Sequence, residues 1–238
     1  MDQTEEIFKN LYKVFSQYPK PDRVFGSPIS VNEGDDLPLV SKHLKYLTYE
    51  DFGSYPFKSM STWGTEENFM YFLPRMLELS FYGFGLLDGS IFFSKILSAG
   101  WEDWNSEQKE AFDSYLRAMW NDATQYPYLD SFRLKTLIDN LSYFIDDLDE
   151  LVYAWAKRWI EAEDEETFEK LVAYLDRNWV DVFFKNKPHY AFLDAILESS
   201  LHERLESAFF KYEKSKPQFA TQLSRCEEKL SYYLANFT

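Results

Sequence analysis

The fold is decided by residues 62 to 80, which read Thr62-Trp-Gly-Thr-Glu-Glu-Asn-Phe-Met-Tyr-Phe-Leu-Pro-Arg-Met-Leu-Glu-Leu-Ser80. Thr65 is a good helix N-cap, and the two glutamates that follow it suit the positive end of the helix dipole. Apolar residues then continue with helical spacing as far as Leu79. Pro74 interrupts this run, removes one backbone hydrogen bond and predicts a kink. The stretch therefore predicts a helix that organises the fold.

Apolar stripes with the period of a helix recur over most of the chain. Glycine is scarce, at 8 residues, which argues against a sandwich, a barrel or a Rossmann-type sheet. We therefore predict an all-α fold, an irregular array of antiparallel helices that is solenoid-like (HEAT-like) in its C-terminal half, although no letter-by-letter repeat is present. Outside residues 62–80, the helices expected in the first half are Thr4–Tyr18, Leu37–Leu47, Tyr49–Met60, Asp88–Ala99 and one capped by Ser106.

The domain organisation follows from the prolines and glycines that interrupt the helical pattern. Residues 19–36 contain three prolines and two glycines and predict a long irregular loop. Pro127 marks a break in the helical pattern, which places a sub-boundary near residues 125–130. Because apolar stripes continue on both sides of this break, we predict a single helical domain over residues 1–238.

The formal net charge is −15, and no basic stripe of the kind found in nucleic-acid-binding domains is present. We therefore expect no nucleic-acid partner. The densest acidic segment, Asp146–Glu169, has two interpretations. It is either a solvated face that aids solubility or a patch that meets a basic partner.

The sequence also predicts a cytoplasmic location. The single cysteine, Cys226, excludes an intramolecular disulfide and suits a reducing compartment. Its position on an apolar stripe indicates a packed core residue. The N-terminal residues do not resemble a secretory signal, and no uncharged apolar run is long enough to span a bilayer, so we expect no membrane association.

Two acidic constellations are considered for metal chemistry. The segment Asp146–Glu150 is similar to the aspartate-rich helix motif of class I isoprenoid synthases, which hold magnesium through carboxylates. A second metal-binding helix is missing from the sequence, and capping of a helix start explains the same residues. Glu198 and His202 lie four residues apart and either share an ion or form a surface hydrogen bond. We expect no metal and no cofactor.

The candidate binding residues surround the proline-containing helix: Trp63, Arg75, Glu78, Trp101 and Trp104. Arg75 is either a paired residue that ties the helix to its neighbour or an arginine on the wall of a cleft that grips a carboxylate or phosphate. Clustered tryptophans fill cores and also anchor interfaces.

Three pieces of sequence resemble the central signature of an uncharacterised bacterial family of helical proteins. They are Thr-Trp-Gly at residues 62–64, Phe-Leu-Pro-Arg-Met-Leu-Glu-Leu at residues 72–79 and Gly-Trp-Glu-Asp-Trp at residues 100–104. The resemblance covers the middle third of the chain. It implies a bacterial, intracellular setting and a role for Arg75 and Glu78, and it brings no function.

Two hypotheses for function follow. The first is a non-enzymatic interaction protein, for example an antitoxin or immunity-type inhibitor whose acidic face captures a basic toxin. The second is a small-ligand binder or enzyme with a cleft near Arg75. The sequence contains neither a serine in a Gly-x-Ser-x-Gly elbow nor a glycine-rich loop that could hold a phosphate. This favours the hypothesis of a non-enzymatic interaction protein.

Overall fold

The computed structural model describes residues 3–82, 90–125, 131–178 and 187–237. The described residues are predominantly helical and contain no β-strand beyond two isolated bridges. The all-α prediction is therefore confirmed. Among the described residues, no helix combines the length and apolar character needed to cross a membrane.

The chain divides into two compact units, Met1–Met119 and Trp120–Thr238. The division falls inside helix α7, Ser106–Gln125. It lies close to the sub-boundary expected near residues 125–130, of which 126–130 lie outside the described residues. A single domain over residues 1–238 stays a prediction.

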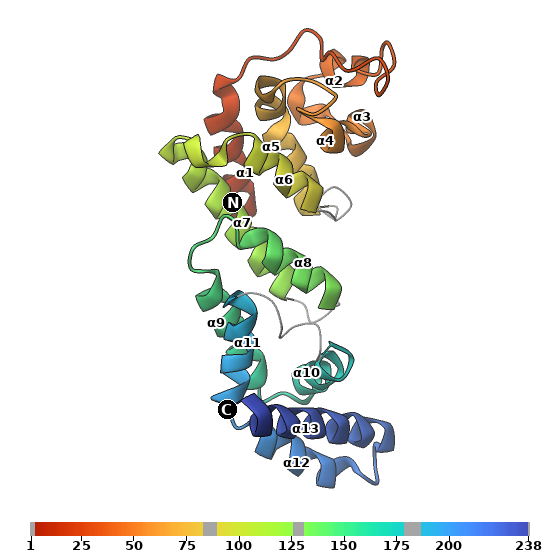
Figure 1. The fold of residues 1–238 in the computed structure, drawn as a ribbon, viewed down its shortest axis with the longest axis vertical. Coiled ribbons are helices and arrows are strands. Elements are labelled where there is room, and N and C mark those ends of the chain that lie inside the picture. The colour runs from red at the N-terminus through yellow and green to blue at the C-terminus, as the bar shows by residue number, and fades with distance from the viewer. Residues whose placement is uncertain (1–2, 83–89, 126–130, 179–186, 238) are drawn as a thin grey trace. The chain divides into compact units, whose positions relative to one another are not determined.

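The first unit is built from helices of very different lengths (Figure 1). The two short helices expected over residues 37–47 and 49–60 are each divided in two. The extended backbone of Lys42 ends the first helix of one range, and Pro56 lies in the first turn of the second helix of the other. The elements are α1 Gln3–Val14, η1 Phe15–Gln17, α2 Leu37–Ser41, η2 Leu44–Tyr46, α3 Tyr49–Phe52, α4 Tyr55–Lys58, α5 Glu66–Tyr82, α6 Ser90–Ser98, η3 Trp101–Asp103 and α7.

Helix α5 begins as the sequence predicts. The Thr65 hydroxyl accepts a hydrogen bond from the backbone N–H of Asn68 at 3.3 Å, and the Asn68 side chain accepts one from the N–H of Thr65 at 3.1 Å. This reciprocal pair satisfies two of the free donors at the helix start. The helix continues through Pro74, which is buried among its apolar neighbours. Burial of that face against α1 and η1 compensates for the missing hydrogen bond.

The cap of helix α7 differs from the prediction. Asn105, and not Ser106, accepts a hydrogen bond from the backbone N–H of Gln108 at 3.0 Å. The Gln108 side chain in turn accepts one from the N–H of Asn105 at 3.1 Å. Asparagine and serine cap equally well, so the start of the helix was uncertain by one residue.

The irregular segment 19–36 contains no helix and is fastened to the residues before α5. The Trp63 indole N–H donates to the Val24 carbonyl at 3.1 Å. Backbone bonds join Ser27 N–H to the Thr62 carbonyl and Gly64 N–H to the Phe25 carbonyl, both at 2.7 Å. Tertiary hydrogen bonds therefore replace regular secondary structure along this loop.

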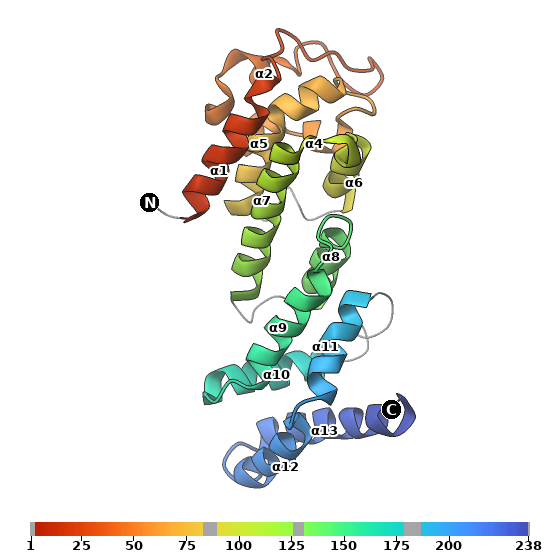
Figure 2. The same cartoon turned by 90° about the vertical axis from the view of Figure 1, so that its left-hand side faces the viewer.

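The described residues of the second unit form six further helices (Figure 2). Helix α9 packs most closely against α11, and α12 against α13, which also contacts α10. Trp179, Val182 and Phe183, which the sequence assigns to the α10 stripe, lie outside the described residues. The helices are α8 Ser131–Leu141, α9 Leu148–Ile160, α10 Glu165–Asn178, α11 Lys187–Leu197, α12 Leu201–Tyr212 and α13 Pro217–Phe237.

Candidate functional site

Arg75 and Glu78 lie on helix α5 and are held by two other segments of the first unit. The Arg75 Nε donates to the Leu47 carbonyl at 2.7 Å, and its Nη1 donates to Glu78 Oε2 at 2.6 Å. The Tyr12 hydroxyl of α1 donates to the same carboxylate oxygen at 2.6 Å. Only 17% of the Arg75 side chain and 24% of the Glu78 side chain are exposed. The cluster therefore ties α5 to α1 and to the turn after η2.

The Tyr12 hydroxyl is a hydrogen-bond donor and not a base. Burial raises its pKa well above the ordinary value, and the hydrogen bond and charge of Glu78 raise it further. The ammonium group of Lys45 lies 4.9 Å from the centroid of the Tyr12 ring. The Tyr12 hydroxyl therefore keeps its proton at neutral pH, which fits a fixed polar contact between elements.

The structure brings Trp101 and Trp104 together and gives Trp63 different neighbours. The Trp101 and Trp104 ring centroids are 5.4 Å apart, and the Trp104 indole donates to the Ala99 carbonyl at 2.9 Å. Trp63 is edge-on to Tyr55 at 5.4 Å. Trp63 and Trp104 are both buried. Their contacts favour packing, and ligand binding by the five candidate residues stays a prediction.

Glu198 and His202 have separate partners. Glu198 accepts a hydrogen bond from the Tyr153 hydroxyl at 2.6 Å. The His202 Nε2 lies 3.0 Å from the Ser231 hydroxyl and 3.2 Å from Glu227 Oε1. The histidine therefore joins α12 to α13, while the glutamate contacts α9.

The acidic segment Asp146–Glu150 surrounds the start of helix α9. Asp147 is its N-cap residue, and Asp149 and Glu150 lie in its first turn. This position favours negative charge through the helix dipole. Among the described residues, no group of three or more histidine, cysteine, aspartate or glutamate side chains is arranged to hold a metal ion.

Cys226 occupies a core position on α13, as predicted. Its thiol lies 3.5 Å from the Val172 carbonyl. Burial raises the pKa of the Cys226 thiol to about 12, and the charge of Asp176 raises it as well. A thiol with such a pKa remains protonated at neutral pH and is a poor nucleophile.

An acidic pocket of about 610 Å³ opens in the second unit where two helix connections meet. The α9–α10 connection contributes Glu161 and Glu163, and the α11–α12 connection contributes Glu198. Arg204 from α12 is the one cation among the lining residues. The complete lining is Ile160, Glu161, Ala162, Glu163, Glu198, Ser199, Ser200 and Arg204.

Arg204 does not neutralise this pocket through a direct ion pair. Its Nη1 donates to the Ile160 carbonyl at 2.7 Å and its Nη2 to the Ala162 carbonyl at 2.6 Å. The guanidinium carbon also lies 4.0 Å from the centroid of the Phe168 ring. Burial lowers the pKa of Arg204, while the charges of Asp164 and Glu163 raise it. An arginine stays protonated in spite of such a shift. Arg204 is therefore a charged donor that satisfies carbonyl groups at the C-terminal end of α9.

The three carboxylates are weakly compensated. Glu161 is 3.8 Å from the Lys157 ammonium, and both side chains are more than half exposed. Such exposed pairs contribute little. Glu198 uses one carboxylate oxygen for the Tyr153 hydroxyl. The pocket therefore offers excess negative charge to a cationic group such as a lysine or arginine side chain.

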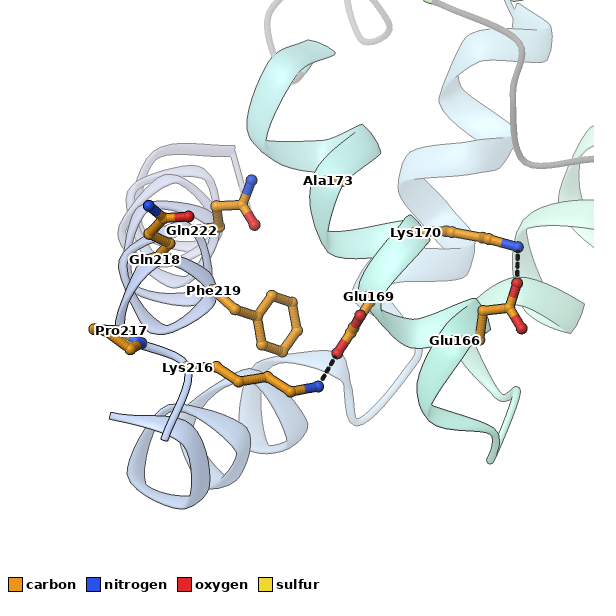
Figure 3. A pocket seen from close by; sticks show the side chains of 9 residues that line it. All are labelled: Glu166, Glu169, Lys170, Ala173, Lys216, Pro217, Gln218, Phe219 and Gln222. Atoms are coloured by element: carbon orange, nitrogen blue, oxygen red, sulfur yellow. Dashed lines mark hydrogen bonds and ion pairs between the residues drawn. The ribbon is translucent and has the colours of Figure 1, made fainter. Parts of the chain in front are cut away.

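A second pocket, of about 660 Å³, lies between α10 and α13 and is close to neutral (Figure 3). The Phe219 ring points from α13 toward α10, as Figure 3 shows. Lys216 pairs with Glu169 and Lys170 pairs with Glu166, each at 2.5 Å. Because its lysines and glutamates neutralise each other, this pocket has no comparable preference for a charged group.

Replacing Arg204 by methionine is expected to lower the free energy of unfolding by about 2 kcal/mol, because two charge-assisted hydrogen bonds to carbonyls are lost. The methionine retains a side chain of similar length. Chemical denaturation measures the effect. Arg158→Met is the control, since the hydrogen bond from Arg158 Nη2 to the Thr124 carbonyl is long at 3.5 Å. Equal stability of the two variants contradicts the assigned role of Arg204.

Sequence reasoning found part of this site. It singled out the acidic segment that contains Glu161 and Glu163, and it considered Glu198 only as a partner of His202. It missed Arg204, whose only signal is its place between the apolar positions Leu201 and Leu205.

Comparison with protein-family models, curated proteins and solved structures returns no match for this chain. The resemblance to a bacterial helical family therefore stays a sequence-based interpretation. The function has to be argued from the geometry of the chain itself.

Proposed function

We propose that this protein is a non-enzymatic interaction module whose acidic pocket receives a basic side chain of a protein partner. The observation that carries the proposal is the pocket lined by Glu161, Glu163 and Glu198, in which the only lining cation, Arg204, is bonded to backbone carbonyls. A lysine or arginine that enters this pocket gains charge-assisted hydrogen bonds.

The charge of the whole chain supports the same partner class. A net charge of −15 attracts a basic protein at a distance and raises the rate of encounter. A concrete form of the proposal is an antitoxin or immunity-type inhibitor of a basic toxin. This form requires that a neighbouring gene encodes such a toxin, and a gene neighbourhood without one contradicts it.

The proposal includes the prediction that the C-terminal half is a solenoid-like array of antiparallel helices. In a solenoid-like array of antiparallel helices, alternate connections gather on one face and can form a binding surface. The shared pocket of the α9–α10 and α11–α12 connections supports such an array in the C-terminal half. We further propose that the protein acts in the bacterial cytoplasm, with support from its single, buried cysteine and from the sequence resemblance.

The alternative function, ligand binding or catalysis at Arg75, has less support. Two of the nitrogens of Arg75 already donate hydrogen bonds to Leu47 and Glu78. The N–H groups that remain belong to a side chain that is only 17% exposed, which restricts the access of a carboxylate or phosphate to them.

The test compares three proteins as bait in a pull-down from the native host: the unaltered chain, E161Q/E163Q/E198Q and the control E5Q/E6Q/E66Q. Both variants lose three exposed or partly exposed carboxylates. We expect a stoichiometric basic protein on the unaltered chain and the control, with affinity for the pocket variant reduced ~10-fold or more.

Two outcomes contradict the proposal. One is that no stoichiometric protein partner is recovered from the native host. The other is that the purified partner binds the pocket variant and the control with equal affinity, which assigns binding to net charge alone. Thermal unfolding of all three proteins checks that the substitutions leave the fold unchanged.

A further inference from the structure

Two large apolar side chains point into solvent from the irregular loop of the first unit. Phe25 is 77% exposed and Ile29 is 95% exposed. Pro28, between them, is also exposed. We call these three residues the apolar tip. The valines on either side of the tip, Val24 and Val31, are 2% and 9% exposed. The two valines at the ends of this segment are therefore buried, while the apolar tip between them is exposed to solvent.

The apolar tip is held in place from several directions. The Phe25 carbonyl accepts a hydrogen bond from the Gly64 N–H at 2.7 Å. The Ser27 carbonyl accepts from the N–H groups of Ser30 and Val31 at 2.8 and 2.9 Å, which closes a turn around Ile29. The Lys58 ammonium donates to the Ser30 carbonyl at 2.7 Å. A surface that is ordered before binding loses little conformational entropy when a partner arrives.

Close packing beneath the tip keeps its apolar side chains outside. A Cβ atom added to Gly26 would meet Val31 Cγ2 at 2.5 Å and the Thr62 carbonyl oxygen at 3.1 Å. The space under the loop is therefore filled by Val31. Phe25 has the Arg23 guanidinium 5.7 Å from its ring centroid, which leaves most of the ring in solvent.

The charges around the tip are mainly negative. Arg23 is paired with Asp36 through hydrogen bonds of 2.6 and 3.1 Å. The exposed charged residues left on residues 19–36 are Lys20, Asp22, Glu33 and Asp35. With Lys58 on the Ser30 carbonyl, these make three carboxylates and two ammonium groups. This small excess of negative charge, on a chain of net charge −15, repels an anionic membrane surface and attracts a basic one.

We propose that the apolar tip is a docking surface for a partner protein that presents an apolar patch bordered by lysine or arginine. Phe25 and Ile29 supply the apolar anchors, and the exposed carboxylates of the loop meet the basic border. This surface belongs to the first unit and does not depend on the acidic pocket of the second.

The test uses a short helical peptide of leucine and lysine as the probe, labelled for fluorescence anisotropy, at physiological salt. A peptide of the same length made of leucine and glutamate is the charge control. The variant F25S/I29S removes the tip, and F210S removes a phenylalanine that is 64% exposed elsewhere. The three substituted positions are uncharged before and after substitution, so a general attraction to the acidic chain is the same in each protein.

We expect F25S/I29S to weaken binding of the leucine–lysine peptide ~10-fold or more, with F210S unchanged and the leucine–glutamate peptide unbound. Equal binding by F25S/I29S and F210S overturns the proposal, and so does equal binding of the two peptides. Vesicles of phosphatidylcholine, with and without phosphatidylglycerol, are tested in parallel. Tip-dependent binding to vesicles but not to the peptide also overturns it, since the occupant is then a lipid surface.

A second readout places the peptide on the tip. Ile29→Cys is labelled with an environment-sensitive dye, because Cys226 is buried and does not compete for the label. We expect the emission to shift to shorter wavelength when the leucine–lysine peptide is added. No shift at a peptide concentration that saturates the anisotropy signal contradicts docking at the tip.

Discussion

Replacing Trp63 by alanine is expected to lower the free energy of unfolding by about 4 kcal/mol, the range seen when a large core aromatic is removed. Trp63 is 5% exposed and edge-on to Tyr55. Its indole N–H also holds the Val24 carbonyl at 3.1 Å, which remains without that donor in the variant. The loss combines a cavity with an unsatisfied buried acceptor. Chemical denaturation followed by circular dichroism measures it.

Two controls separate these contributions. Trp63→Phe keeps most of the buried ring and removes the indole donor, so we expect a loss of about 1–2 kcal/mol. Tyr143→Ala removes an aromatic that is 65% exposed and should change stability by less than ~1 kcal/mol. If Trp63→Ala is as stable as Tyr143→Ala, the indole is not part of the core, and its role as a binding residue gains support.

Replacing Arg75 by alanine is expected to lower the free energy of unfolding by about 3 kcal/mol, because one partner of a largely buried ion pair is removed. The substitution leaves the Leu47 carbonyl without its 2.7 Å donor and leaves Glu78 facing Tyr12 alone. Chemical denaturation gives the magnitude, and loss of the contact between α5 and the turn after η2 is its structural cause.

The control for Arg75 is Arg117→Ala. Arg117 pairs with Asp113 one turn away at 2.8 Å, and both side chains are about one-third exposed, so we expect a loss below ~1 kcal/mol. An Arg75→Ala protein with unchanged stability contradicts the structural role and restores the hypothesis of a ligand cleft. The single substitution therefore decides between the two interpretations of this residue.

Much of the secondary structure could be predicted because its signals are local. The Thr65 cap and the apolar period of α5 involve residues within a few positions of one another. The starts of α9 and α13 carry equally local marks in Asp147 and Pro217. Errors arose where two neighbouring residues cap equally well, as at Asn105 and Ser106, or where extended backbone at Lys42 and a new helix start at Pro56 divide a short apolar run.

The candidate site could be predicted only in part. The acidic composition of its first connection is visible in the sequence at Glu161 and Glu163. Glu198 and Arg204 join that connection from 35 residues or more further along the chain, a relation that no local pattern records. The hydrogen bonds of Arg204 to Ile160 and Ala162 span 44 and 42 residues.

By itself, the sequence determined that this acidic chain forms helices, where most of them begin and which residues enter a core. The period of an apolar stripe, the caps and the prolines act through neighbours along the chain, so they can be read without a fold. The tertiary structure alone decided that Arg75 is bonded to Leu47, that Arg204 clasps the end of α9, and that Phe25 and Ile29 remain in solvent. These outcomes depend on which distant backbone atoms and side chains come within a few ångströms, and packing, not local propensity, sets those distances.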